Sequence, residues 1–255
     1  MIPSRLRRLA SVAAGPLVLF GCATQTVEFP SETARGHISA RLGRPGFVVA
    51  APHGTTDVRT GDIAAEIARR TGFGLVVASG FALGGDPRES PGRRYQVNRP
   101  LEGTPGRPPS EERATEAARR VYEAYEARVR EIAQGPLRFY TEIHGNNRPE
   151  SANRIEIATV GIDREYAQRL RALAELIRDA HLRGRRGVPR LEVAVEPADT
   201  LFYAATGAKR DGILRVPERG LHIELPKAAR QDFRELYTAI LADFVAQAVT
   251  VPRGR

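Results

Sequence analysis

Three short stretches of the sequence carry residue types that could bind a metal ion and cleave a bond. Two histidines and one carboxylate are the protein ligands of many catalytic zinc ions, which keep one position open for water. A further carboxylate nearby could take the proton of that water. These residue types therefore indicate metal-dependent hydrolysis. The stretches are Pro52-His53-Gly54 with Asp57, Glu142-Ile143-His144-Gly145, and His222-Ile223-Glu224.

Apolar runs typical of buried strands position these residues. The runs 47–51 and 139–143 end directly before Pro52 and His144, and Glu224 lies inside a third run, 221–225. Strand ends of an α/β sheet deliver side chains into a crevice at one edge. The three stretches are therefore expected to meet at such an edge.

The rest of the chain alternates predicted strands and helices. This alternation favours an α/β fold with a mixed, largely parallel sheet flanked by helices. Residues 84–109 are rich in glycine, proline and arginine and are expected to form mostly loop. Strands are predicted over 47–51, 75–79, 137–143, 154–160, 191–195 and 221–225, and helices over 60–70, 110–133, 163–182 and 232–249.

The N-terminus has the pattern of an export signal. Residues 1–21 contain three early arginines and an apolar run from about residue 9 to 20, which is too short to span a bilayer as a stable helix. The run ends in Leu19-Phe20-Gly21-Cys22, which resembles the lipobox of bacterial lipoproteins. That resemblance implies lipidation of Cys22 and a location in the cell envelope, anchored to the membrane. The alternative is an ordinary cleaved signal with an incidental cysteine.

Composition limits the ligands and partners of the remaining chain. Cys22 is the only cysteine, so the lipidation that the lipobox resemblance implies would leave no free thiol, and a metal site would then use histidine and carboxylate. The net charge of the full sequence is +9 and falls to +6 without the three arginines of the signal, which favours anionic neighbours. Nucleic acid is not an expected partner, because no basic stretch is interleaved with aromatic residues. Residues 22–45 are expected to form a tether and residues 46–250 the catalytic domain.

The order of the motifs resembles that of zinc carboxypeptidase-like hydrolases, in particular the N-formylglutamate amidohydrolase and poly-γ-glutamate hydrolase branches. The resemblance extends over about residues 47–230, and it implies a carboxypeptidase-like fold with zinc at the strand ends. The motifs that carry it are Pro52-His53-Gly54 with Asp57 and Thr60, Asn98-Arg99-Pro100, Glu142-x-His144-Gly145, and Glu224.

The resemblance also implies which residues hold the metal. It assigns zinc to His53, Asp57 and His144, with Asp62 as an alternative to Asp57. We prefer Asp57, because Asp62 falls inside the predicted helix that follows. Glu142 is expected on the opposite side of its strand from His144, in a supporting or structural position.

Further polar residues are candidates for binding the substrate. The resemblance implies that Asn98 and Arg99 hold a substrate carboxylate, for which a guanidinium offers a matching planar fork. Arg148 is expected to line the same pocket, and His222 is expected to stabilise negative charge that develops during the reaction. The competing arginines are Arg93, Arg94 and Arg154.

Glu224 matches the late catalytic glutamate of the family, and is therefore expected to act as the general base. The alternative is a structural ion pair with Lys227 or Arg230.

Together these features predict an envelope-anchored zinc-dependent hydrolase that cleaves an amide bond next to a carboxylate. Small anionic peptides of the γ-glutamyl or peptidoglycan type are the expected substrates. The alternative is a non-catalytic envelope lipoprotein that retains the fold as a binding module. A serine hydrolase is disfavoured, because the sequence has no Gly-x-Ser-x-Gly elbow.

Overall fold

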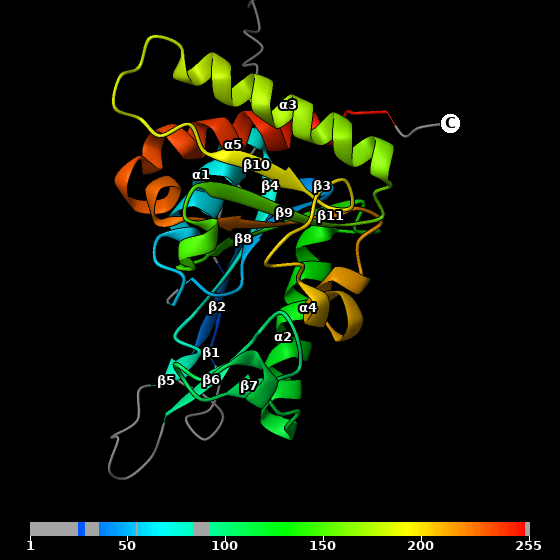
Figure 1. Cartoon of the computed structure of the whole chain (residues 1–255). Coiled ribbons are helices and arrows are strands. Elements are labelled where there is room, and N and C mark those ends of the chain that lie inside the picture. Colours follow the sequence, from blue (N-terminus) through cyan, green and yellow to red (C-terminus); the bar gives the residue numbers. More distant parts are fainter. Residues whose placement is uncertain (1–24, 29–35, 55, 84–91, 253–255) are drawn as a thin grey trace, which may run out of the picture.

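The computed structural model of the chain describes residues 25–28, 36–54, 56–83 and 92–252 (Figure 1). The predicted signal, 1–21, and the lipidation site, Cys22, lie outside the described residues. Among the helices that are described, none combines the length and the hydrophobicity that crossing a bilayer requires.

A mixed sheet of eight strands forms the centre of the fold. Its order is β1-β2-β4-β3-β8-β11-β9-β10. Strand β3 is parallel to β4 and β8, β8 is parallel to β11, and β9 is parallel to β10, whereas the other three pairs are antiparallel. The strands are β1 (Gln25–Glu28), β2 (His37–Arg41), β3 (Arg44–Ala51), β4 (Phe73–Ser79), β8 (Phe139–Gly145), β9 (Arg154–Val160), β10 (Glu192–Val195) and β11 (Gly220–Leu225).

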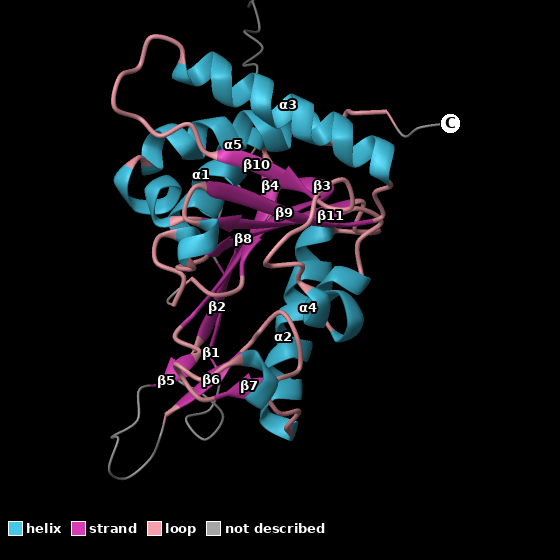
Figure 2. Cartoon of the chain, viewed as in Figure 1, coloured by secondary structure: helices cyan, strands magenta, loops and turns pink. Residues whose placement is uncertain are grey.

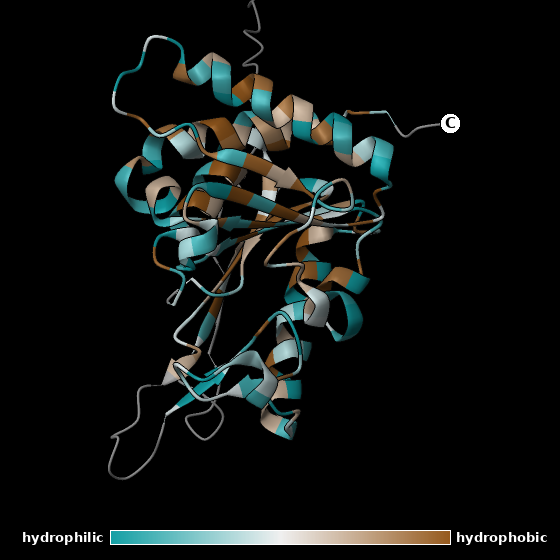
Figure 3. Cartoon of the chain, viewed as in Figure 1, coloured by the Kyte–Doolittle hydropathy of each residue, from teal (hydrophilic) through white to brown (hydrophobic). Residues whose placement is uncertain are grey.

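Helices cover both faces of this sheet (Figure 2). Helices α1, α3 and α5 pack on one face around one apolar cluster, and α2 and α4 contribute to a second cluster on the other face. Apolar residues accordingly concentrate between the layers, as Figure 3 shows. The α/β prediction is thus confirmed. The helices are α1 (Thr60–Thr71), α2 (Glu116–Ala133), α3 (Arg164–Leu182), α4 (Thr206–Asp211) and α5 (Arg234–Ala248).

Side-chain caps fix where the two longest helices begin. The carboxylate of Asp163 accepts a hydrogen bond from the Tyr166 amide at 2.7 Å, at the predicted start of α3. The hydroxyl of Thr115 accepts from the Ala118 amide at 3.1 Å. Helix α2 therefore begins at Glu116 instead of the predicted residue 110. Shorter helical turns lie at Pro109–Glu111, Pro149–Ser151, Ile213–Arg215 and Ala228–Asp232.

Part of the predicted tether, 22–45, belongs to the sheet. Strand β2 pairs antiparallel with β4, and Ile38 and Ala40 are buried against the second apolar cluster. Ile38 and Ala40 alternate with less buried neighbours, which is the two-residue period of a strand with one buried face. The tether prediction is therefore wrong for residues 25–28 and 37–41, because both segments pair in the sheet, and β3 begins inside the predicted tether at Arg44.

A small second sheet occupies part of the predicted loop 84–109. It has the order β5-β6-β7, and residues 84–91 between its first two strands lie outside the described part. This sheet brings residues 94–101 to one wall of the pocket described below. Its strands are β5 (Ala82–Leu83), β6 (Arg93–Tyr95) and β7 (Glu102–Gly103).

Candidate metal centre

Three adjacent parallel strands bring the chemically interesting residues to one edge of the sheet. The chain leaves β3 just before His53, and β8 and β11 end at Gly145 and Leu225. In the register of β8 and β11, Glu224 lies opposite His144 and His222 lies opposite Glu142. The meeting of the three stretches that the sequence predicted is therefore observed.

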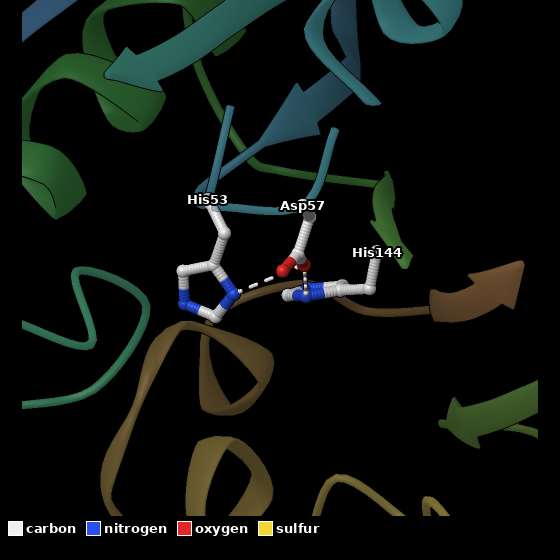
Figure 4. Close-up of side chains that lie close together, drawn as sticks. All are labelled: His53, Asp57 and His144. Carbon is white, nitrogen blue, oxygen red and sulfur yellow. Dashed lines mark hydrogen bonds and ion pairs between the residues drawn. The ribbon is translucent and has the colours of Figure 1, made fainter. Parts of the chain in front are cut away.

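His53, Asp57 and His144 form a compact group at this edge (Figure 4). Oδ2 of Asp57 lies 3.3 Å from Nδ1 of His53 and 3.4 Å from Nδ1 of His144. The Gly145 amide donates to the same oxygen at 3.2 Å. Potential ligand atoms of the three side chains lie within 4.8 Å of one another, as required to hold one metal ion.

A tight turn after β3 places Asp57 beside His53. The Asp57 amide donates to the His53 carbonyl at 2.8 Å, and the Gly54 amide donates to the Ala78 carbonyl of β4 at 2.9 Å. The Thr60 hydroxyl donates to the Asp57 carbonyl at 2.7 Å, directly before α1. These hydrogen bonds hold Asp57 beside His53, the candidate ligand four residues before it in the sequence.

Contacts behind the two imidazoles orient them for metal binding. Nε2 of His53 lies 2.9 Å from the Gln96 carbonyl, which can only accept, so this nitrogen carries a hydrogen and Nδ1 faces Asp57. Nε2 of His144 lies 3.4 Å from Oε1 of Glu142, at ion-pair distance. A carbonyl or carboxylate behind a ligating histidine is the usual support of a metal ligand.

Opposite charges balance one another inside the group. Burial alone would raise the pKa of Asp57, but hydrogen bonds from His144 and His53 hold that pKa well below its usual range. Burial lowers the pKa of His144, but the charge of Glu142 and the hydrogen bond to Asp57 outweigh it and raise that pKa to about 10. These contacts favour an ionised Asp57 and a protonated His144. A divalent cation would replace such protons.

A second group of possible ligands shares His144 with the first. Glu142, His144 and His222 also offer atoms within 4.8 Å of one another. All three are buried, and Nδ1 of His222 lies 2.6 Å from Oε1 of Glu142, as expected for a direct hydrogen bond. All members of the first group line an open pocket, whereas Glu142 does not. His53, Asp57 and His144 are therefore the better candidates for holding a metal ion that acts on a molecule bound in the pocket.

Glu224 lines the same pocket. Its Oε1 lies 3.0 Å from Nε2 of His222, and among the described residues its buried Oε2 has no hydrogen-bond partner. The alternative ion pairs with Lys227 and Arg230 are absent from the described contacts. The Arg230 guanidinium instead donates to the Val58 and Asn146 carbonyls, at 3.3 Å each, and to the Asn147 side chain.

The expected direction of Glu142 is wrong. Residues two apart on a strand share a face, and Glu142 indeed lies on the same side as His144. It is fully buried beneath the candidate ligands. Its supporting position was predicted; the contacts with His144 and His222 were not. His222, expected near the substrate, has both ring nitrogens facing carboxylates.

The predicted substrate-binding residues are placed unequally. Asn98 is fully buried and donates to Glu142 at 3.4 Å. Arg99 lines the pocket, but its guanidinium is bound to Glu112 at 2.9 Å. Arg148 also lines the pocket, with its guanidinium 5.2 Å from the ring centre of Tyr203, and it takes part in none of the ion pairs found among the described residues.

The other candidate arginines pair with carboxylates, and three further residues that no motif predicted line the pocket. Arg93 pairs with Glu102 and Arg154 with Glu156 and Glu192, while Arg94 lies 3.6 Å from Glu112. Glu112, Gln96 and Tyr203 line the pocket without having been singled out, because they belong to segments without a motif.

The remaining acidic and histidine alternatives lie elsewhere. Asp62 is exposed and pairs with Arg59 and Arg234 at 3.0 and 3.2 Å. His181 lies 2.7 Å from Asp243. Asp57 is therefore the carboxylate that the fold places between the two histidines.

Comparison with known proteins adds similarities of overall fold. No protein-family model matches the chain, and neither does any curated protein. A bacteriophage poly-gamma-glutamate hydrolase is similar over 84% of this chain and 88% of its own, with 12% identity and a TM-score of 0.46. The zinc-free structure YNDL-apo is similar over 88% of this chain and 94% of its own, with 12% identity and a TM-score of 0.45. The gene product Atu2144 of Agrobacterium tumefaciens is similar over 87% of this chain and 95% of its own, with 16% identity and a TM-score of 0.43.

The first of these structures bears the name of one of the families that the motif order resembles. At TM-scores this low, the likeness does not assign an activity. The chemistry of this chain has to follow from the residues of its own pocket.

Replacement of Asp57 tests the metal centre. Asp57→Asn removes the negative charge between the two imidazoles, and we expect the affinity for zinc, as the test ion, to fall by more than about 100-fold. Elemental analysis after dialysis measures the metal content. Asp62→Asn makes the same chemical change at the exposed alternative and should retain the metal. Full metal content in Asp57→Asn would contradict the assignment.

Replacement of Gly54 tests the turn. A Cβ there would lie 2.9 Å from the Ala78 carbonyl oxygen, so the turn has to move away from β4. We expect Gly54→Ala to lower the free energy of unfolding by about 1–3 kcal/mol and to weaken metal binding. In the control Gly72→Ala the Cβ meets nothing within 4 Å, and only the left-handed φ of 71° is unfavourable. Urea unfolding and metal titration should show that Gly72→Ala loses stability alone.

Proposed function

We propose that the chain is a zinc-dependent hydrolase that cleaves an amide bond next to a carboxylate. One observation carries this proposal. Two imidazole nitrogens and the carboxylate of Asp57 converge on the wall of a pocket, and Glu224 enters the same pocket directly across the strand pair from His144. Metal ligands and an acid–base group therefore border a single space open to a substrate.

The donor set suits zinc. Nδ1 of His53, Nδ1 of His144 and a carboxylate oxygen of Asp57 would hold the ion, as in catalytic sites with three protein ligands. When bound, zinc lowers the pKa of a water molecule and polarises a carbonyl group. Each supporting contact behind these ligands comes from the chain itself, through the Gln96 carbonyl and Glu142.

Glu224 is suited to move a proton. Its Oε1 is fixed by His222, which leaves Oε2 facing no described partner. Oε2 would accept a proton from the attacking water and return it to the nitrogen of the leaving amine. Because the side chain is only 6% exposed, the position of this oxygen is set by the protein.

Arg148 is the best candidate to bind the substrate carboxylate. Its guanidinium has no described carboxylate partner, whereas Glu112 already engages Arg99 and Arg94. Tyr203 lies against the Arg148 guanidinium and limits its movement. A guanidinium without an acidic partner offers its donors to an incoming carboxylate at the lowest cost.

The substrate class and location complete the proposal. A carboxylate beside the scissile amide is a feature of γ-glutamyl and peptidoglycan-type peptides. The lipobox-like sequence before Cys22 supports a lipid anchor that holds the protein at the membrane of the cell envelope. A panel of γ-glutamyl and muropeptide amides, incubated with the zinc-loaded protein, tests this proposal. Zinc binding without hydrolysis of any member would favour a binding module.

Glu224→Gln tests the acid–base role. The amide keeps the shape of the side chain but cannot accept the proton, so we expect kcat to fall by about 100-fold or more while zinc content is unchanged. Glu235→Gln, on the exposed surface of α5, is the matched control and should retain full activity. Wild-type turnover in Glu224→Gln would exclude this residue as the base.

Arg148→Gln tests recognition of the substrate carboxylate. Loss of a charge-assisted hydrogen bond should raise KM by about 10- to 100-fold, with a smaller change in kcat. Steady-state kinetics of Arg186→Gln, an exposed arginine with the same change of charge, provide the comparison. An unchanged KM in Arg148→Gln, together with a raised KM in Arg94→Gln, would place the substrate carboxylate at Arg94 instead.

A further inference from the structure

The geometry points to Glu142 as a positioning residue that supports His144 directly and Glu224 through His222. One buried carboxylate would thus align both the metal ligand and the acid–base group. This inference rests on the proposed function, because it concerns residues of the same pocket.

Glu142 is a convergence point of side chains from several elements. Its carboxylate lies 2.6 Å from Nδ1 of His222, 3.2 Å from the Tyr140 hydroxyl, 3.4 Å from Nε2 of His144 and 3.4 Å from Nδ2 of Asn98. The residue is fully buried. A buried carboxylate surrounded by donors is held in one orientation, because rotation would leave polar atoms unpaired.

His222 transmits this orientation to Glu224. Its two ring nitrogens face different carboxylates, Nδ1 that of Glu142 and Nε2 Oε1 of Glu224 at 3.0 Å. The ring cannot rotate without losing one of these contacts. It also stacks on the His144 ring, with centroids 4.0 Å apart. The alignment of Glu224 therefore depends on Glu142 even though the two carboxylates belong to different strands.

The contacts that hold Glu142 in place extend to helix α2. The Tyr140 hydroxyl that contacts Glu142 lies 2.8 Å from the hydroxyl of Tyr125, on helix α2. Both tyrosines are fully buried. Helix α2 thus backs the carboxylate from the face away from α1, α3 and α5.

This arrangement predicts different effects for the two supporting residues. Removal of the Glu142 charge disturbs His144 and His222 together, so metal affinity and turnover should both suffer. Removal of the His222 ring disturbs Glu224 while His144 keeps its contact with Glu142. A metal held by Glu142, His144 and His222 would give another pattern, in which either change removes a ligand.

Two variants of the full chain separate these possibilities. We expect Glu142→Gln to lower zinc affinity by about 10- to 100-fold, the usual effect of losing a contact behind a metal ligand. We expect His222→Asn to leave zinc affinity within about threefold of wild type, well below that range, and to lower kcat on the order of 100-fold without changing KM. Competition with a chromophoric chelator measures zinc affinity, and kinetics at saturating zinc measure kcat and KM.

Glu156→Gln is the matched control for Glu142→Gln. Glu156 is equally buried in the sheet, but it accepts hydrogen bonds from the Phe202 and Tyr203 amides and does not contact the candidate ligands. Zinc affinity should therefore stay unchanged in this control. If Glu142→Gln does not fold, Tyr140→Phe removes one contact of Glu142 and should still lower zinc affinity severalfold.

Other outcomes would overturn the inference. Wild-type zinc affinity in Glu142→Gln, or in Tyr140→Phe where it replaces that variant, would remove the support of His144. An equal loss of zinc in His222→Asn and Glu142→Gln would place the metal on the second group. Absence of hydrolysis in the wild type would refute the proposed function alone, because the zinc affinities of the variants still decide whether Glu142 supports the metal ligand.

Discussion

The register between β8 and β11 is the constraint on which the site depends. It sets Glu224 opposite His144 and Glu142 opposite His222, so four ionisable side chains share one face of a strand pair. If β11 slipped by one residue against β8, His222 and Glu224 would turn to the other face of the sheet. Because both strands are buried along most of their length, the apolar residues between these positions, Ile143 and Ile223, fix the register from the opposite face.

Burial makes this cluster costly unless every charge is balanced. Ionised side chains in the interior lose their hydration, and mutual contacts recover that loss only when the geometry is good. Glu142 meets this condition through several hydrogen bonds, whereas Oε2 of Glu224 and Nε2 of His144 have no hydrogen-bond partner among the described residues, and Nε2 of His144 has only the ion-pair contact with Glu142 at 3.4 Å. Apolar side chains in these places would stabilise the sheet at least as well. The cluster is therefore better explained by chemistry than by stability.

The sequence predicted the site as far as local patterns reach. Apolar runs end before His53 and His144, and Asp57 lies four residues after His53, ahead of α1, so these positions follow from strand ends and a turn. The contacts of Glu142 with His222 did not follow, because they depend on the pairing of two strands that are far apart in the chain. Burial of Asn98 beneath the pocket likewise depends on the second sheet. The strand β2 was missed because its alternation is only five residues long.

The distribution of charge around the pocket favours one arginine over the others as the site for an anionic group. Two arginines on one wall, Arg94 and Arg99, share the carboxylate of Glu112, which is only 5% exposed and therefore not free to turn away into water. An incoming anion at that wall has to compete with a carboxylate that is already in place. At Arg148 the same anion meets a guanidinium that has no acidic partner among the described residues and lies 5.2 Å from the ring centre of Tyr203. Since a tethered competitor acts at a high effective concentration, Arg148 is the arginine at which a substrate carboxylate gains most from binding.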